Sequence, residues 1–229
     1  MRVLGIIPAR GGSKGLPGKN IKLLNGIPLI AYTIKEALNS NLEEFIVSTD
    51  SEEIAEVARN YGGKVPFLRP AEIATDNASS LDVVLHALDF MKEHEGKEYD
   101  AIMLLQPTTP YRDREDINQA INLLMSSGAD SVISVTDVGG THPARMKFIV
   151  DGNLIDPPFV EAFEGQNRQE LPPMYIRNGG IYLTKVDTIR KGSFKGNISK
   201  ALVMPEKKSV NIDNIDDFEF AEWLMSKHQ

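Results

Sequence analysis

The stretch Val3-Leu4-Gly5-Ile6-Ile7-Pro8-Ala9-Arg10-Gly11-Gly12-Ser13-Lys14-Gly15 decides the fold that the rest of the chain is expected to adopt. Its first half is a short aliphatic run, which is typical of a strand buried on both faces. Its second half is rich in Gly and basic residues, so the strand opens into a sharp turn. A buried strand followed by such a turn favours an α/β protein with a parallel sheet.

The same alternation continues along the chain and extends this prediction. Apolar runs at residues 45–48, 64–68, 101–106 and 131–135 are expected as strands, and later ones at 180–184 and 201–203. Amphipathic stretches of helical period lie at 29–39, 52–61, 80–94, 114–127 and 215–225. Strands separated by helices predict an α/β fold with a mostly parallel sheet and helices on both faces.

The alternation breaks at Asp137, and residues 137–176 are rich in Gly, Pro and long polar side chains. A structureless stretch of this length is unusual inside a compact domain. Phe159 and Phe163 give it apolar anchors, which favours an inserted arm that reaches a partner subunit over an unstructured surface excursion. We therefore expect a core formed by residues 1–136 and 177–229, and an arm formed by residues 137–176.

The Gly-rich turn carries cations in the positions that a polyphosphate requires. Glycines aim several backbone N–H groups at one anion, and Arg10, Lys14 and Lys19 add three positive charges within ten residues. The spacing fits neither the Walker A loop nor the G-x-G-x-x-G dinucleotide motif. A basic surface loop without a ligand is the alternative, but the position after a buried strand favours triphosphate binding.

The overall composition limits the partners. The chain has 229 residues with 41% apolar and 25% charged residues, which is ordinary for a globular protein with a core. A net charge of −7 argues against a broad nucleic-acid surface. The absence of Cys excludes disulfides, thiolate nucleophiles and Cys-ligated metals. No membrane partner is expected, and the expected location is cytoplasmic.

Five segments, taken in order, resemble the motifs of the cytidylyltransferases that activate sialic acid and related 2-keto-3-deoxy sugars. The first is R-x-x-S-K-x-x-P-x-K-N at residues 10–20, and the others lie at 68–80, 104–110, 168–182 and 209–213. The matches run across essentially the whole chain. The resemblance implies a Rossmann-like α/β fold of the nucleotide-diphospho-sugar transferase type with a small swapped dimerisation arm, and therefore a homodimer.

The resemblance also implies the site residues. Those expected to bind the nucleotide are Arg10, Gly11, Ser13, Lys14, Lys19, Asn20, Arg69, Ala78 and Ser80. Those expected to bind the sugar are Gln106, Thr108, Thr109, Arg145, Arg168, Asn178 and Tyr182. On the bare sequence, Ser80 and Thr109 fit helix starts as well, and Arg145 fits a solvated surface position.

Asp213 is the strongest metal candidate, because a carboxylate-held Mg²⁺ offsets charge that develops on departing pyrophosphate. The family usually shows D-x-D here, whereas this chain reads Asn211-Ile212-Asp213. The Asn211 amide oxygen still suits a metal but carries no charge, which leaves one or two metals open. Arg10, Lys14, Lys19 and Asp213 are the expected catalytic residues.

The implied activity is transfer of CMP from CTP to the anomeric hydroxyl of a nine-carbon acidic sugar, with release of pyrophosphate. N-acetylneuraminate, legionaminate and pseudaminate all remain open as the sugar. The alternatives are a 3-deoxy-manno-octulosonate cytidylyltransferase, a nucleotidyltransferase for sugar 1-phosphates, and a catalytically impaired nucleotide-binding regulatory protein.

Overall fold

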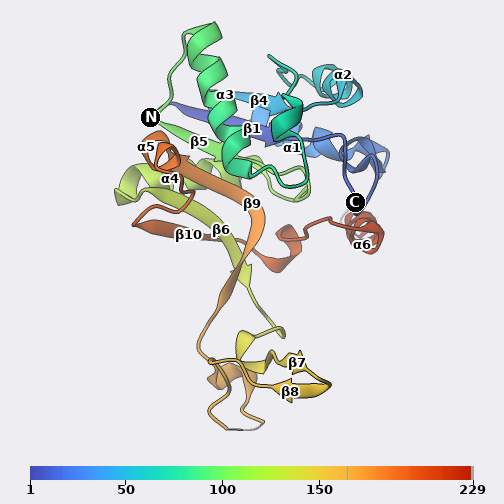
Figure 1. The fold of residues 1–229 in the computed structure, drawn as a ribbon, viewed down its shortest axis with the longest axis vertical. Helices are drawn as coiled ribbons and strands as arrows, with labels where there is room; N and C mark the ends of the chain where they lie inside the picture. The colour runs from blue at the N-terminus through green and yellow to red at the C-terminus, as the bar shows by residue number, and fades with distance from the viewer. Residues whose placement is uncertain (164, 228–229) are drawn as a thin grey trace.

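A six-stranded sheet forms the centre of the computed structural model, which describes residues 1–163 and 165–227. Its strands are β1 (Val3–Pro8), β4 (Glu44–Ser48), β5 (Ala101–Leu104), β6 (Ser131–Asp137), β9 (Tyr175–Lys185) and β10 (Ser199–Val203). They lie in the order β10-β6-β9-β5-β1-β4 (Figure 1). β9 runs antiparallel to both of its neighbours, and all other pairs are parallel. The predicted mostly parallel α/β sheet is confirmed.

Helices cover both faces of this sheet. They are α1 (Leu29–Leu38), α2 (Glu52–Asn60), α3 (Ser80–Glu95), α4 (Arg114–Ser127) and α5 (Val186–Arg190), whereas the last helix, α6 (Ile215–Ser226), packs elsewhere. On one face, apolar side chains of α1, α2 and α4 pack on the strands, and on the other those of α3 and α5 do so. Alternate residues of one strand serve the two faces: Ile7 joins the first cluster and Ile6 the second.

One expected strand is absent. Residues 64–68 form only a single parallel bridge, between Thr49 and Leu68, and one backbone hydrogen bond from Val47 to Lys64. Pro66 has no N–H to donate to a ladder, which explains why an apolar run fails to pair as a full strand. Two short antiparallel pairs are also present: β2 (Leu23–Leu24) with β3 (Ile27–Pro28), and, within the segment expected as an inserted arm or hairpin, β7 (Phe148–Val150) with β8 (Asn153–Ile155).

The sheet has a topological switch point at β1. The chain continues from β1 to β4 on one side, and later returns to β5 on the other side of β1. In such sheets the loops that leave the carboxyl ends of the two neighbouring strands diverge and leave a crevice. Here those loops are residues 9–18 after β1 and residues 105–113 after β5.

A third apolar cluster anchors the far end of the chain beside the first loop. Phe218 and Ala221 of α6 pack with Leu16, Leu24 and Ile212. The loop after β1 and the segment before α6 therefore share one small core, although about 200 residues separate them.

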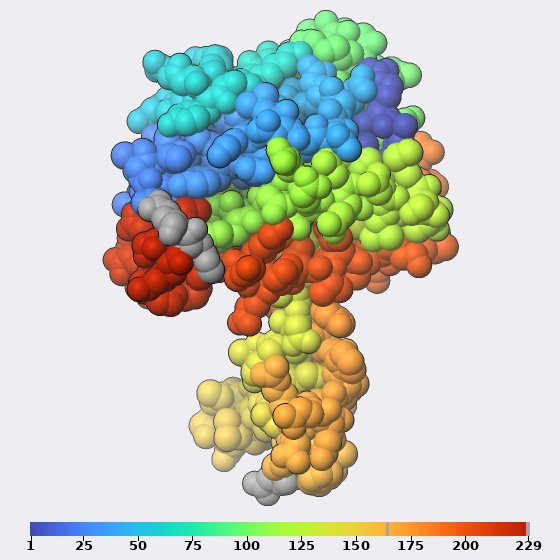
Figure 2. Space-filling view, turned by 180° about the vertical axis from the view of Figure 1, so that it is seen from behind, coloured from blue at the N-terminus to red at the C-terminus, as the bar shows by residue number. Residues whose placement is uncertain are grey.

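Residues 138–174 project from the sheet as an arm, carried by the long strands β6 and β9 (Figure 1). The space-filling view shows this arm standing clear of the core (Figure 2). Its β7–β8 hairpin exposes apolar side chains, with Ile149 76% and Leu154 71% exposed. A lone hairpin of this kind is marginally stable in water, so its exposed apolar surface requires an explanation.

Candidate functional site

A cavity of about 590 Å³ lies at the switch point, where the loops after β1 and β5 meet the segment before α6. Its lining residues are Pro8, Arg10, Ser13, Lys14, Gly15, Lys19, Asn20, Asp76, Gln106, Pro107, Thr108, Asn211 and Asp213. A Cβ on Gly15 would collide with the backbone carbonyl of Asp213, so glycine allows the loop to close against that segment. We refer to this space as the phosphate-side cavity.

Two of its cations are held by one carboxylate. Asp76 accepts from Arg10 at 2.5 Å and pairs with Lys14 at 2.6 Å. Hydrogen bonds from Lys14 and then Arg10 keep the pKa of the Asp76 carboxyl below its ordinary value. The Lys14 side chain is 81% exposed, so it can turn toward another anion at little cost. Asp76 thus pairs with the two cations that a phosphate group in this cavity would contact.

Lys19 and Asn20 lie deeper than Lys14. The Lys19 ammonium donates to the Ile212 carbonyl at 2.8 Å and lies 3.5 Å from Asp213, with its side chain only 12% exposed. The buried Asn20 amide donates to the Arg10 carbonyl at 3.0 Å. Asn20 therefore supports the loop that presents Arg10, while Lys19 links that loop to the segment before α6. The Gly11 amide is engaged by Asp50 at 2.9 Å.

A smaller cavity of about 250 Å³ adjoins the first and shares Pro8, Arg10 and Asp76 with it. Arg69, Ala78 and Ser80 also line it. The Arg69 guanidinium is buried against Ser48, where it donates to both the hydroxyl and the carbonyl. Burial lowers the pKa of Arg69 to about 10, which still leaves it charged at neutral pH. We refer to this space as the nucleoside-side cavity.

The helix start beside it has a separate structural role. Ser79, which precedes Ser80, caps α3 through a reciprocal pair of bonds with Asp82. Ser80 is the first residue of the helix and lines the cavity. Ser79 therefore caps the helix, and Ser80 lines the cavity.

A third cavity of about 380 Å³ adjoins the other side of the phosphate-side cavity, with which it shares Gln106 and Asn211. Its remaining lining residues are Thr136, Ile176, Arg177, Asn178, Gly179, Tyr182 and Ser209. Gly179 has φ +76°, and a Cβ there would approach the Gln106 side-chain oxygen to 2.9 Å, so glycine is required beside Gln106. We refer to this space as the sugar-side cavity.

Two of the predicted sugar residues are engaged within the protein. Asn178 donates to Ser209 at 2.9 Å and accepts from Ser134 at 2.6 Å. Thr109 is fully buried, and its hydroxyl lies 3.4 Å from the Asn178 carbonyl. Asn178 fixes the wall of the sugar-side cavity, whereas Thr109 lines none of the three cavities and instead supports the Asn178 backbone.

Asn211 and Asp213 provide oxygen atoms of the kind that Mg²⁺ prefers. Both line the phosphate-side cavity, and the Asn211 amide nitrogen donates to Asp213 at 2.6 Å. This bond leaves the Asn211 oxygen free for a ligand. Within residues 1–163 and 165–227, no group of three or more His, Cys, Asp or Glu could hold a metal alone. One carboxylate and one amide fit a magnesium ion that arrives with a nucleotide, because Mg²⁺ takes most of its ligands from phosphates and water.

The structure does not bring Arg145 and Arg168 to these cavities within one chain. Both lie in the arm, in short 3-10 helices at Pro143–Arg145 and Arg168–Glu170. Arg145 is engaged locally by Glu161 and by the Gln166 carbonyl, each at 2.7 Å. No carboxylate in the described part of the chain pairs with Arg168.

Several lining residues were not predicted as site residues. Asp76 lies in a segment that the sequence had singled out, but its two cation partners are far away in sequence. Thr136, Ile176 and Arg177 come from the paired ends of β6 and β9, where Thr136 is opposite Ile176 and Val135 is opposite Arg177. Ile176 and Arg177 directly precede the predicted site residue Asn178 in the sequence. This position could have identified them, because neighbouring residues of one strand lie at the same end of the sheet.

The comparisons with known proteins agree with this geometry. A model of the family described as "Cytidylyltransferase" matches residues 4–151. A structure described as a CMP-2-keto-3-deoxy-manno-octonic acid synthetase complexed with CTP superposes over all of both chains with a TM-score of 0.74. Its sequence identity is 18%, so this likeness concerns the fold.

Two relatives are similar to this chain in sequence. A CMP-N,N'-diacetyllegionaminic acid synthase from Legionella pneumophila is 40% identical and covers 100% of this chain and 98% of its own. An N-acylneuraminate cytidylyltransferase from Escherichia coli is 37% identical over 99% of this chain, which spans 52% of that protein. The cavity row, the family match and these relatives lead to one conclusion: the chain belongs to the cytidylyltransferase family of nucleotidyltransferases.

Proposed function

We propose that the chain transfers CMP from CTP to the anomeric hydroxyl of a nine-carbon acidic sugar and releases pyrophosphate. The observation that carries the proposal is the row of three adjoining cavities, in which shared residues join the nucleoside side, the phosphate side and the sugar side. A row of this kind can hold a nucleotide and an acceptor with the reacting atoms between them. The names of the relatives support the same chemistry.

In this proposal the chain acts by positioning and charge. Arg69 and Ser80 hold the nucleoside, and Arg10, Lys14 and Lys19 neutralise the phosphates as charge moves to the leaving pyrophosphate. Gln106, Thr108 and Tyr182 hold the sugar so that its anomeric oxygen faces the α-phosphorus. No covalent intermediate on the protein is required.

Asn211 and Asp213 would hold magnesium on the phosphates. When bound, the ion offsets charge on the phosphate oxygens. Asp213 would then exchange its contact with Lys19 for the metal, which its 69% exposure permits. Lys19 would keep its bond to the Ile212 carbonyl.

The arm residues enter through a second copy. Ile149 and Leu154 are exposed on the hairpin, and Arg168 stands away from the cavities of its own chain. A homodimer would cover the hairpin and could deliver the Arg168 guanidinium to the partner's sugar-side cavity, as a two-point clamp on a carboxylate. Arg145 is the weaker candidate for this role, because Glu161 already pairs with it.

Pyrophosphate release with CTP, Mg²⁺ and a panel of sugars tests the activity. The panel is diacetyllegionaminate, N-acetylneuraminate, pseudaminate, 3-deoxy-manno-octulosonate and a hexose 1-phosphate. We expect turnover with at least one nine-carbon acid. Turnover with the octulosonate alone would assign the alternative acceptor, and turnover with the 1-phosphate alone would overturn the substrate class. Tight CTP binding without any turnover would support a regulatory role.

The role of the arm is tested with Ile149→Asp, which places a charge on the exposed hairpin. Light scattering should show a dimer for the wild type and a monomer for the variant. The KM for the sugar should rise at least about tenfold while CTP affinity stays unchanged, because only the sugar side is completed by the partner. Lys200→Asp, a charge change on the exposed edge strand β10, is the control. A wild type that is monomeric and fully active would contradict the dimer.

A further inference from the structure

The segment that carries Asn211 and Asp213 has little regular structure of its own. It runs from the 3-10 helix η5 (Glu206–Lys208) to α6, with neither helix nor strand between them. Its backbone is tied at Ile212, which donates to the Thr108 carbonyl at 2.8 Å and accepts from Lys19 at 2.8 Å, and at Asp213, whose amide donates to Asp217 of α6 at 2.8 Å. At the end that precedes Asn211, the Asn178 amide donates to the Ser209 hydroxyl at 2.9 Å, which is a single neutral contact.

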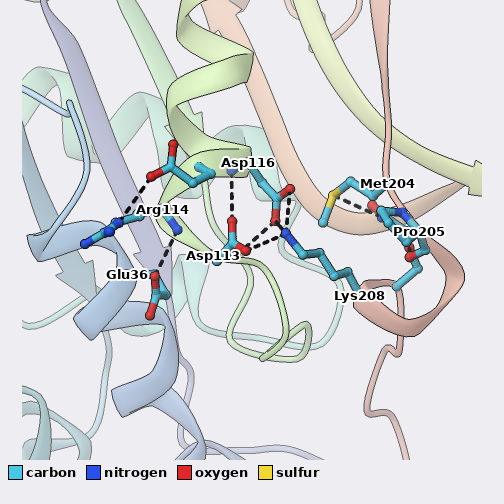
Figure 3. Close-up of polar contacts among 10 residues, drawn as sticks. Glu36, Asp113, Arg114, Asp116, Met204, Pro205 and Lys208 are labelled. Atoms are coloured by element: carbon cyan, nitrogen blue, oxygen red, sulfur yellow. Dashed lines mark hydrogen bonds and ion pairs between the residues drawn. The ribbon is translucent and has the colours of Figure 1, made fainter. Parts of the chain in front are cut away.

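Lys208 provides a further attachment at this end, and it is a charged one. Its ammonium lies 2.5 Å from the Asp113 carboxylate and 3.0 Å from that of Asp116 (Figure 3). The lysine comes from η5 and the two aspartates from the first turn of α4, so the contact joins segments about 95 residues apart. The Lys208 side chain is 25% exposed and that of Asp116 only 9%, so water screens the pair weakly.

The two aspartates need this cation. Asp113 is the N-cap of α4 and Asp116 is its capping-box partner, which places two carboxylates at one helix start. Burial raises the pKa of Asp116, while hydrogen bonds from Lys208 and Asp116 overcome burial and lower the pKa of Asp113. Removing the ammonium would leave two close carboxylates partly buried without their counter-charge.

The start of α4 is itself held rigidly. Arg112, which is fully buried, donates to the Gly180 carbonyl at 2.7 Å and to Thr33 at 2.8 Å. The Arg114 amide donates to Glu36 at 2.9 Å (Figure 3). Because the loop that carries Gln106 and Thr108 leads directly into this turn, the turn is a fixed point between β5, β9 and α1.

We infer that Lys208 is a positioning residue that sets Asn211 and Asp213 at the right distance from the Gln106 loop for a metal-bound nucleotide. The inference rests on the proposed function. Lys208 lines none of the three cavities, so it acts through the segment and touches no substrate. Outer residues that orient metal ligands typically change metal affinity about 10- to 100-fold when they are removed.

The test is calorimetry of CTP binding to Lys208→Met, once with Mg²⁺ and once with a chelator. We expect binding with Mg²⁺ to weaken about tenfold, and binding without metal to stay within about twofold of the wild type. The half-saturating Mg²⁺ concentration for pyrophosphate release should rise by a similar factor. Lys208→Arg should restore most of the metal dependence, since a guanidinium can bridge the same carboxylates.

Lys207→Met is the matched control, because it removes the same charge from the next residue. Lys207 is exposed and pairs with no carboxylate among the described residues, so its variant should behave as the wild type. Thermal unfolding shows whether each variant is folded. If Lys208→Met fails to fold, Asp113→Asn removes the shorter of the two ion pairs, leaves the pair with Asp116 and keeps a capping oxygen, so the same change in metal dependence should appear in weaker form.

Two results would overturn the inference. Equal loss of CTP binding with and without Mg²⁺ would show that Lys208 only stabilises the fold, and an unchanged metal dependence would show that it has no positioning role. Failure of the proposed function has a different signature, namely a wild type that turns over no acidic sugar. The calorimetric comparison does not depend on turnover and reports on Lys208 in either case.

Discussion

Ionised side chains cluster at both ends of the central sheet, and the two clusters differ in their balance of positive and negative charge. At the amino ends of β4 and β5, Glu44 accepts from Lys64 at 2.8 Å, Lys97 at 2.9 Å and Tyr99 at 2.7 Å. Glu95 pairs with the same two lysines, at 2.8 and 3.3 Å. Two carboxylates therefore face two ammonium groups, and the cluster is complete without a ligand.

At the carboxyl ends the balance is positive. Three cations, Arg10, Lys14 and Lys19, face two carboxylates, Asp76 and Asp213. The Asp213 side chain is 69% exposed and lies 3.5 Å from the Lys19 ammonium. A cavity of about 590 Å³ opens between them. The difference indicates that the balanced cluster stabilises the fold and that the cationic one is available for an anionic ligand. Substitutions in the two clusters should therefore separate activity from stability.

Lys19→Ala should have the largest effect on activity. It removes the least exposed cation of the phosphate-side cavity, and we expect turnover to fall by about 10²- to 10³-fold. The free energy of unfolding should fall by only about 1 kcal/mol, which corresponds to the lost bond to Ile212. Pyrophosphate release and chemical unfolding measure the two quantities.

The control is Lys22→Ala, which removes a cation three residues further along the chain. The Lys22 ammonium lies 5.3 Å from the Phe218 ring centre, away from the cavity residues, so turnover should stay near that of the wild type. Near-normal turnover of Lys19→Ala would contradict the assignment of this cluster to the phosphates.

Glu44→Gln should have the opposite profile, with a loss of stability and unchanged kinetics. Burial opposes the charged form of Glu44, but hydrogen bonds from Lys64, Lys97 and Tyr99 outweigh it and lower its pKa to about 2. A carboxyl whose pKa is lowered in the folded state stabilises that state above its ordinary pKa of 4.5. We expect the variant to lose about 1–3 kcal/mol of unfolding free energy at neutral pH.

The pH dependence follows from the same shift. The contribution of Glu44 is fully present above pH 4.5 and is lost as the pH falls from there toward 2. Wild type and Glu44→Gln should therefore converge in stability as the solution becomes acidic. Glu43→Gln is the control, since Glu43 is 52% exposed and lies 3.8 Å from Arg2. A stability difference that persists at the acidic end would contradict the pairing as its cause.

The sequence predicted the layers of the fold because the apolar patterns are local. The helix at Arg114–Ser127 and the strand at Val3–Pro8 can be read from periodicity and from the loop that follows. The run at residues 64–68 was predicted wrongly, since one proline outweighs its apolar character. Strand β9 extends to Tyr175, beyond the expected start, because it pairs with the end of β6 at the base of the arm.

Less of the site than of the fold could be predicted from the sequence. Lys14 and Lys19 are recognisable from their own loop, and the structure does place both on the phosphate-side cavity. The partners of Asp76 and the buried position of Thr109 depend on contacts across 60 residues or more, which no local pattern encodes. Arg145 and Arg168 could reach a sugar only in a second chain, so their sugar-binding roles stay predictions.

Asp76→Asn should have the smallest effect, and it tests whether the cationic cluster is truly available to a ligand. In the wild type a triphosphate must displace the Asp76 carboxylate from Arg10 and Lys14, whereas in the variant both cations are free. Because the pairs are partly exposed, the gain is modest: we expect CTP to bind about two- to fivefold more tightly without metal.

Calorimetry at low and high salt measures this gain in CTP affinity, which should shrink at high salt because ions screen exposed charges. Hydrogen bonds from Lys14 and Arg10 keep the Asp76 pKa below its ordinary value, so the difference should hold from neutral into mildly acidic solution. Weaker CTP binding by the variant would show instead that Asp76 contacts the nucleotide or its metal, and the cationic cluster would then need its carboxylate as much as the balanced one does.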